Sequence, residues 1–505
     1  MAVQDAAAAQ EGNNILASAL DVDIISGDVK ELSVTALSTQ HGNISLGTAT
    51  INTDSLGITA QGGNVTVSQT LTLNATRGTA IYVNGGNLSF GEGSSVKITS
   101  KIDASCSWGG NSAPYSYDGV FVEGGSLIAD GVFDVAHTGT ENEEQYDGTN
   151  GSSLYREFVV RSYAVRVKSI DRAAANVSIL RGEISNSVGG GVYVSVSGDT
   201  DRVTLGETGS DSLTIRSTGG ELYESGEEYI PIENAAGNWS YRQSKTGGHA
   251  VEVNGGNLTL NGGNYSSVQG EGILVKSGVV NVYGGTYVGK DNYSYNGSNI
   301  AGPAASYSFK MYGGTANIYG GTFGLENGAG SGAFIMGNLE TGAMADANIY
   351  GGTFSVGGQA GFSLFEYADV LFAPYGGENG AGSDINVSGV ACGIAVENRR
   401  ASVKIEITGG SFKSTGASGS YDGIWYSNPN AQLTIRGGTF QGSVRSGLYF
   451  EVRPNSGNVQ LYGGTFIRAG QNFPIGGNYS EQNILAGNYY LDKSSAGSWT
   501  VRSSQ

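Results

Sequence analysis

The stretch Val280-Asn281-Val282-Tyr283-Gly284-Gly285-Thr286-Tyr287 recurs along the chain and decides its fold. Its pattern is apolar, polar, apolar, polar, Gly-Gly, small polar, aromatic. Further copies, each given by its first and last residue, are Ala316–Phe323, Ala347–Phe354, Ile405–Phe412, Leu433–Phe440 and Val459–Phe466. The alternation before the glycines is the period of a strand with one buried face. Glycine tolerates the positive φ of a tight bend, so the Gly-Gly pair predicts a corner between two strands.

The spacing of the copies predicts a solenoid. The first glycines of the pairs lie at 262, 284, 320, 351, 409, 437 and 463, so successive copies are 22 to 58 residues apart. Within the longest gap, Ile385-Asn386-Val387-Ser388-Gly389 is interpreted as a degenerate copy of the strand that precedes the corner. A recurrence with variable inserts is typical of a solenoid, in which each repeat buries its apolar face on its neighbours.

A second Gly-Gly corner refines the coil. Gly255 and Gly262 begin two pairs seven residues apart, and the same spacing recurs between Gly313 and Gly320. One coil therefore consists of strand, corner, strand, corner, strand and a longer loop. We expect an all-β fold, a right-handed single-stranded parallel β-helix with three short strands per coil. Each strand should pair in parallel with its equivalent in the next coil, about 4.8 Å away.

The rest of the chain is organised around this repeat. Residues 1–12 are expected to form an N-terminal extension or cap, residues 13–470 the β-helix, and residues 471–505 the last coil and a C-terminal cap. Loop insertions are predicted where the regular pattern is interrupted, at about 102–118, 137–160, 218–248, 288–307 and 370–384. Function concentrates on loops that a rigid scaffold holds.

The composition excludes collagen and disfavours nucleic acid and the membrane as partners. The 505 residues include 84 Gly but only 7 Pro and no Gly-X-Y period, which excludes collagen. Acidic residues outnumber basic ones, 45 to 27, and this disfavours nucleic acid, whose binding rests on Lys and Arg contacts to phosphate. No stretch has the apolar length of a membrane helix, so we expect no membrane insertion by this chain.

The residue patterns predict neither a catalytic set nor a metal site. The three histidines, His41, His137 and His249, lie far apart in the sequence and are expected to be polar surface residues. The acidic run at 141–144 has ligands that Ca²⁺ could use, but a solvated loop is favoured. Cys392 lies in an apolar run and is expected in the core. We expect no cofactor.

The Gly-Gly corners also carry a resemblance, through pairs such as those in Gly351–Phe354 and Gly255–Asn257. Over roughly residues 13–470 the coil pattern resembles the right-handed parallel β-helix of pectate-lyase-like proteins and of autotransporter passenger domains. It is similar to the Gly-Gly-Thr-Phe and Gly-Gly-Asn repeats of bacterial surface adhesins. The resemblance implies an exported bacterial protein that is secreted or held at the cell surface.

The aromatic residues of the repeat form two sets. Those that follow the corner, such as Phe354, are in phase with the buried side and should stack in the core. Tyr283, Tyr319 and Tyr350 precede the corner and are in phase with the exposed side. They occupy the same place in consecutive copies, so we expect their rings about 5 Å apart. A structural ladder is one interpretation, and a platform for a sugar ring is the other.

Four aromatic residues of the predicted loops, Trp239, Tyr241, Tyr293 and Tyr295, are expected to rim one end of that tyrosine face. The resulting hypothesis is an adhesin that binds a glycan or another ligand on a host or neighbouring cell. One alternative is a polysaccharide-degrading enzyme, a lyase or glycosidase, with a loop-built cleft. The other is a structural spacer or a surface fibre formed by self-association.

Overall fold

The computed structural model describes the side chains of most of the chain outside the predicted loops. These residues are 37–102, 117–139, 162–169, 174–198, 200–218, 248–268, 270–289, 307–324, 332–337, 343–357, 360–374, 384–397, 402–417, 421–469 and 472–504. The backbone alone is described for the strands within residues 2–36 and for residues 231–233 and 239–241. Most of each predicted loop insertion therefore lies outside the described residues.

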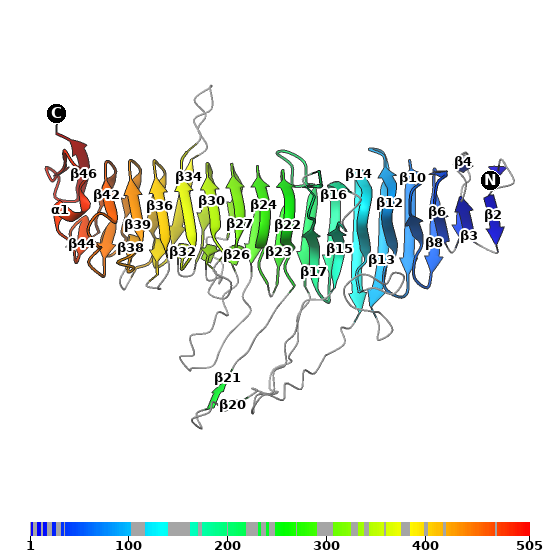
Figure 1. Ribbon diagram of the computed structural model, residues 1–505, viewed down its shortest axis with the longest axis horizontal. Coiled ribbons are helices and arrows are strands. Elements are labelled where there is room, and N and C mark those ends of the chain that lie inside the picture. The colour runs from blue at the N-terminus through cyan, green and yellow to red at the C-terminus, as the bar shows by residue number, and fades with distance from the viewer. Residues whose placement is uncertain are drawn as a thin grey trace.

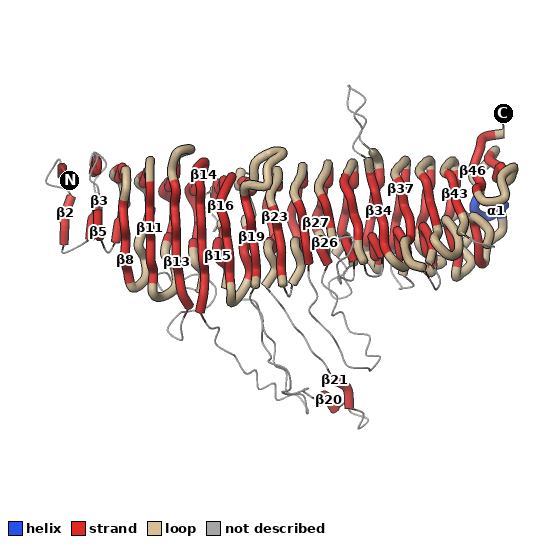
Figure 2. The backbone as a smooth tube through the Cα atoms, turned by 180° about the vertical axis from the view of Figure 1, so that it is seen from behind, coloured by secondary structure: helices blue, strands red, loops and turns tan. Residues whose placement is uncertain are grey.

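The described chain is all-β, as the sequence predicts. It contains strands β1 to β46 and one short helix among the described residues, α1 (Glu481–Ile484). Figure 1 shows the strands side by side along one long axis, with the N-terminus at one end and the C-terminus at the other. Figure 2 shows the turns between strands gathered along the edges of this body. The protein is thus elongated, and its core runs along its length.

Parallel pairs join each coil to the next in three ladders. The first ladder contains β3 (Asn14–Ala17), β6 (Ala36–Thr39), β9 (Ile58–Ala60), the starts of β12 (Ile81–Phe90) and β14 (Val120–Gly139), β15 (Tyr163–Lys168), β17 (Gly190–Ser195), the starts of β22 (Val251–Leu260) and β24 (Ile273–Val282), β26 (Tyr307–Met311), β29 (Gly332–Met336), β32 (Ala360–Leu364), β35 (Cys392–Val396), β38 (Asp422–Tyr426), β41 (Leu448–Phe450) and β44 (Ile475–Gly477).

The second ladder follows the first in every coil. It contains β4 (Asp23–Ser26), β7 (Asn43–Leu46), β10 (Asn64–Val67), the end of β12, the middle of β14, the start of β16 (Ala175–Asn186), β18 (Arg202–Leu205), the ends of β22 and β24, β27 (Gly314–Ile318), β30 (Ala345–Ile349), β33 (Ala368–Phe372), β36 (Val403–Ile407), β39 (Gln432–Ile435) and β42 (Val459–Leu461).

The third ladder follows the second along the chain. It contains β5 (Leu32–Val34), β8 (Ala49–Thr53), β11 (Thr70–Ala75), β13 (Ser95–Ile102), the ends of β14 and β16, β19 (Leu213–Ser217), β23 (Asn264–Ser267), β25 (Thr286–Gly289), β28 (Thr322–Phe323), β31 (Gly352–Ser355), β34 (Ile385–Gly389), β37 (Ser411–Ser414), β40 (Thr439–Gln441) and β43 (Thr465–Ile467).

The Gly-Gly pairs of the repeat, such as Gly284-Gly285 and Gly320-Gly321, form the corner between the second and third ladders, whereas the pairs that begin at Gly255 and Gly313 lie between the first and second. The second glycine of the pair has a positive φ, for example 102° at Gly285 and 109° at Gly321. A side chain with a Cβ atom is strained in this region, whereas glycine is not. The chain can therefore turn within two residues and begin the third-ladder strand at once.

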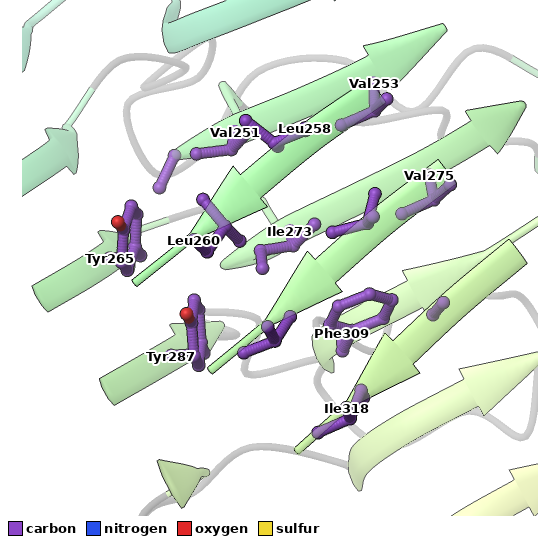
Figure 3. Packing of buried hydrophobic residues seen from close by; sticks show 14 of the residues in the cluster. Val251, Val253, Leu258, Leu260, Tyr265, Ile273, Val275, Tyr287, Phe309 and Ile318 are labelled. Carbon is purple, nitrogen blue, oxygen red and sulfur yellow. The ribbon is translucent and has the colours of Figure 1, made fainter. Parts of the chain in front are cut away.

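The core is built from side chains at alternate strand positions, which point inward. Figure 3 shows Val251, Val253, Leu258 and Leu260 projecting inward beside Tyr265. The aromatic residues after the corner stack on one another, as predicted. Ring centroids are 4.9 Å apart for Tyr265 and Tyr287, 4.8 Å for Tyr287 and Phe323, and 4.6 Å for Phe323 and Phe354.

Two of these core rings are tyrosines, and their hydroxyls have partners at the corner. The Tyr265 hydroxyl donates to the carbonyl oxygen of Gly262 at 2.7 Å, and the Tyr287 hydroxyl donates to that of Gly284 at 2.6 Å. A buried hydroxyl without a partner would destabilise the fold, so each tyrosine uses a carbonyl oxygen at its own corner.

One predicted repeat copy is wrong in its register. The stretch 385–389 is β34, which pairs with β31 and sets Val387 level with Phe354. It therefore follows the corner, and the strand that precedes the corner in this coil is β33. An alternating Ile-x-Val sequence suits either ladder, so only the pairing of neighbouring coils distinguishes them.

Antiparallel pairs lie at both ends of the parallel ladders. Near the N-terminus, β1 (Ala2–Val3) pairs with β4, and β2 (Ala8–Glu11) pairs with β3. Near the C-terminus, β46 (Ser498–Ser503) pairs antiparallel with both β43 and β45 (Tyr489–Asp492). A further antiparallel pair, β20 (Pro231–Glu233) with β21 (Trp239–Tyr241), belongs to neither end and forms its own two-stranded sheet.

Candidate functional site

Tyr283, Tyr319 and Tyr350 stand at the ends of three consecutive second-ladder strands. Their rings are stacked, with centroids 4.9 Å apart for the first pair and 5.0 Å apart for the second. The predicted spacing is therefore confirmed. Tyr283 is 50 % exposed, and the other two rings are half-buried between their neighbours.

A ladder of side-chain amides lies beside these rings. Asn281, Asn317 and Asn348 each precede a tyrosine by two residues and so project from the same outer face. The Asn317 amide donates to the Asn281 oxygen at 2.9 Å, and the Asn348 amide donates to the Asn317 oxygen at 3.0 Å. We call the three tyrosines and three asparagines the tyrosine edge.

The tyrosine edge has defined limits along the chain. Pairing sets Asn261 level with Tyr283 on one side, and Ala373 level with Tyr350 on the other. The aromatic surface therefore spans three coils. Apolar ring faces combined with amide donors and acceptors are the chemistry that recognises a neutral sugar.

The prediction that four loop aromatics rim the tyrosine edge concerns side chains that lie outside the described residues. Trp239 and Tyr241 are the first and last residues of strand β21, whose side chains are not described. Residues 293 and 295 lie outside the described residues. The segment with β20 and β21 follows the third-ladder strand β19 and precedes the first-ladder start of β22. This segment therefore connects the third ladder to the first, whereas the tyrosines lie between the second ladder and the third.

A second polar site, on the outer face of the first ladder, was not predicted. It begins at Arg166, whose Nε donates to Asp118 Oδ2 at 2.6 Å. The central carbon of the Arg166 guanidinium lies 4.9 Å from the ring centroid of Tyr163 and 4.8 Å from that of Tyr193. Asp118 and Arg166 are both buried, so the cation is held by a carboxylate and two aromatic rings.

The site continues over the next coils through two buried glutamates. The Tyr163 hydroxyl donates to Glu252, and Lys276 Nζ lies 2.6 Å from Glu252 Oε1. Glu271 lies 2.5 Å from His249 Nδ1 and 3.0 Å from Lys310 Nζ. Each glutamate therefore has a basic partner. We call this set the ion-pair cluster, formed by Asp118, Tyr163, Arg166, His249, Glu252, Glu271, Lys276 and Lys310.

Ionisation in the ion-pair cluster follows from its pairs. Burial opposes the charge of Glu271, but Lys310 and His249 outweigh it and hold the pKa of Glu271 far below its usual value. Burial likewise opposes the charge of Glu252, and His249 and Lys276 lower the pKa of that carboxyl. Burial and Glu252 together raise the pKa of Tyr163 well above its usual value. The carboxylates are thus charged and the phenol is neutral at neutral pH.

Two histidines are buried, which corrects the prediction that they lie on the surface. His137 Nε2 donates to the carbonyl oxygen of Tyr117 at 2.7 Å, and Ser100 Oγ lies 2.5 Å from Nδ1. Burial lowers the pKa of His137 to about 4, so the ring is neutral. His249 is buried against Glu271, and only His41 is exposed. Partners for the ring nitrogens, Tyr117 and Ser100 for His137 and Glu271 for His249, make this burial possible.

Cys392 is a free, buried thiol, as predicted. No group of three or more His, Cys, Asp or Glu side chains within the described ranges could hold a metal ion. Among those same residues, no helix has the length and apolar character needed to cross a membrane. Comparisons with family models, curated proteins and solved structures find no match to this chain.

The sequence signal for the ion-pair cluster is weak because its members lie between positions 118 and 310. Each is a single charged or polar residue in or just before an apolar strand. Arg166, Glu252 and Lys310 occupy the same outward position of the first ladder, between two core residues. Aligning the sequences of successive coils could have revealed this shared position, but the alignment requires the lengths of the inserts between coils.

Proposed function

We propose that the three parallel ladders are the three sides of a right-handed β-helix, with three strands per coil. The chain visits the first, second and third ladders in order before it enters the next coil. Connections between parallel strands of one sheet are right-handed in nearly all proteins, which supports this hand. In the same proposal, residues 1–12 and 471–505 are caps, because the antiparallel pairs at the ends would protect open strand edges.

We infer that the protein acts outside the bacterial cell, secreted or at the surface, as an adhesin that binds a glycan on a host or neighbouring cell. The observation that carries this inference is the tyrosine edge, where stacked rings lie beside hydrogen-bonded amides. The resemblance to autotransporter passenger domains and surface adhesins is consistent with this location. The net charge of −18 favours a neutral glycan over an acidic polymer.

Binding at such a face is expected to be weak for one copy and strong for many. A few rings and amides on an open surface bury little of a sugar, so each contact has a low affinity. Many copies on one surface raise the overall affinity by increasing the effective concentration. This behaviour suits attachment to a cell.

A triple variant tests the tyrosine edge. Tyr283→Ser, Tyr319→Ser and Tyr350→Ser together keep the position polar and outward while removing all three rings. Binding to whole cells, or to a positive spot on a glycan array, should fall at least about tenfold, while circular dichroism and the melting curve stay close to wild type. Unchanged binding by the folded variant would remove this face and leave a structural spacer, or a fibre formed by self-association, as the better explanation.

The ion-pair cluster favours a second candidate, a polysaccharide lyase or glycosidase. Three carboxylates and four basic side chains converge on the first ladder, next to the points where the segments 140–161, 219–247 and 290–306 rejoin the coils. A screen for polysaccharide degradation tests it, with Glu252→Gln and Tyr163→Phe as variants of the cluster. Degradation by the wild type that both folded variants lose would support an enzyme over an adhesin.

A further inference from the structure

A pocket of about 420 Å³ lies where the second ladder ends, near the C-terminus. Its wall is formed by Gln460 and Tyr462 at β42, by Gln482 and Asn483 of α1, and by Tyr489 at the start of β45. Two rings and three side-chain amides thus face one open cavity. No charged residue is among the described residues that line the cavity.

The Tyr462 ring is held in a fixed orientation. Its hydroxyl donates to Gln460 Oε1 at 2.8 Å. The Arg436 guanidinium lies 4.6 Å from the ring centroid, and the Tyr489 ring meets it edge-on with centroids 5.5 Å apart. Arg436 is itself paired with Glu406 at 2.8 Å, so the positive charge behind the ring is neutralised. A preorganised ring of this kind loses little entropy when a ligand stacks on it.

The amides of α1 supply hydrogen-bonding groups that the protein does not use. Among the described residues, no hydrogen bond engages the side chain of Gln482 or of Asn483, although each amide offers two donors and one acceptor oxygen. Gln482 is exposed and Asn483 is half-buried. Uncharged donors and acceptors beside aromatic rings fit hydroxyl groups on an apolar ring face, which is the chemistry of a neutral sugar.

Tyr462 occupies the same position of the repeat as the three rings of the tyrosine edge. Hydrogen bonds between backbone groups set Tyr350 level in turn with Ala373, Thr408, Arg436 and Tyr462. Tyr350 and Tyr462 are therefore four coil steps apart, which at about 4.8 Å per step is about 19 Å along the axis. The pocket and the tyrosine edge lie on one corner of the molecule.

From this arrangement we propose that the pocket is a second binding site for a neutral saccharide. The site recognises sugar hydroxyls through Gln482 and Asn483, and a ring face through Tyr462 and Tyr489. It deepens the proposed adhesin function and rests on it. Because the two sites share one corner, a long neutral polysaccharide can engage both, whereas a disaccharide occupies only one. The protein therefore prefers polymers to short fragments.

A double variant tests the pocket. Gln482→Ala with Asn483→Ala removes both free amides from exposed or half-buried positions of the helix. On an array of neutral glucans, mannans, galactans and xylans, printed as disaccharides and as polymers, the variant should bind the polymers at least about fivefold more weakly than the wild type. Tyr490→Ser is the matched control, because Tyr490 is 46 % exposed on β45 but does not line the pocket. It should bind like the wild type.

The tyrosine-edge triple variant on the same array separates the two proposals. If that variant loses polymer binding and the folded pocket variant does not, the pocket proposal is overturned and the adhesin function stands. If the pocket variant alone loses binding, the pocket stands and the tyrosine edge is not a site. A wild-type protein that binds no neutral glycan overturns both. Tyr489→Ser repeats the test through the ring, with the melting curve as a check on folding.

Discussion

The tyrosine edge and the ion-pair cluster both contain tyrosine and polar side chains on the outer side of the strands, but one is exposed and the other is largely buried. The tyrosine edge presents rings and amides at the surface, and its side chains bond mainly to their own equivalents in the next coil. The ion-pair cluster buries Tyr163 together with charged carboxylates, and its side chains bond to unlike residues in other coils. A column of identical residues can form from repetition alone. A cluster of buried charges needs each member to match its partners, because an unpaired charge there is costly.

The largest expected effect concerns the ion-pair cluster. Glu271→Ala leaves His249 and Lys310 buried without their shared carboxylate, and loss of one partner of a buried pair costs about 3–5 kcal/mol. The free energy of unfolding, or amide hydrogen exchange in β24 and β26, measures this loss. The control is Asp369→Asn, which removes an exposed pair with Lys404 and should cost about 0–1 kcal/mol. Equal losses in both variants would contradict the difference between the two faces.

The core beneath the tyrosine edge offers a second test. Phe354 is fully buried and stacks on Phe323, so Phe354→Ala should cost about 3–5 kcal/mol and loosen the neighbouring coils. Tyr350→Ser, four residues earlier on the outer side, should leave the melting curve nearly unchanged. Thermal unfolding of both variants under the same conditions makes the comparison. A wild-type melting curve for Phe354→Ala would show that the aromatic stack does not stabilise the coil.

Acid should destabilise the coils around His137, which lies at the third-ladder end of β14. Its pKa is about 4 in the folded protein and about 6.5 when unfolded, so the unfolded chain takes up the proton first as the pH falls. The stabilisation is complete above about pH 6.5, and about 3 kcal/mol is lost between there and about pH 4. Urea unfolding across this range measures the slope. His137→Gln can keep both hydrogen bonds without titrating, so its slope should be smaller, and an identical slope would rule out this histidine.

The smallest effect is expected at the amide ladder. Asn317→Ala removes two side-chain hydrogen bonds, to Asn281 and from Asn348, in a half-buried setting. The cost should be about 1 kcal/mol, because such bonds replace bonds to water. Chemical denaturation measures it, with Asn52→Ala in the exposed amide pair with Asn74 as the matched control at another ladder. A loss as large as that of Glu271→Ala would mean that the two faces are stabilised in the same way.

Local rules explain what could be predicted. The two-residue period of strands identified the core positions, the glycine pairs identified the corner, and the recurrence of Tyr283, Tyr319 and Tyr350 gave their spacing. Each of these depends only on residues within one repeat and on the fixed distance between paired strands. The all-β class and the aromatic core stack follow from them directly.

The tertiary structure decided which strands of neighbouring coils pair with each other and between which ladders each insertion lies. Val387 takes the inward place of an aromatic, His137 and His249 are buried, and the segment with Trp239 lies between the third ladder and the first. The ion-pair cluster unites residues from Asp118 to Lys310 for the same reason. Coils of unequal length bring distant residues together only after every strand has paired. Repetition within the sequence therefore determined the scaffold and the tyrosine spacing, whereas the register between coils decided the charged site.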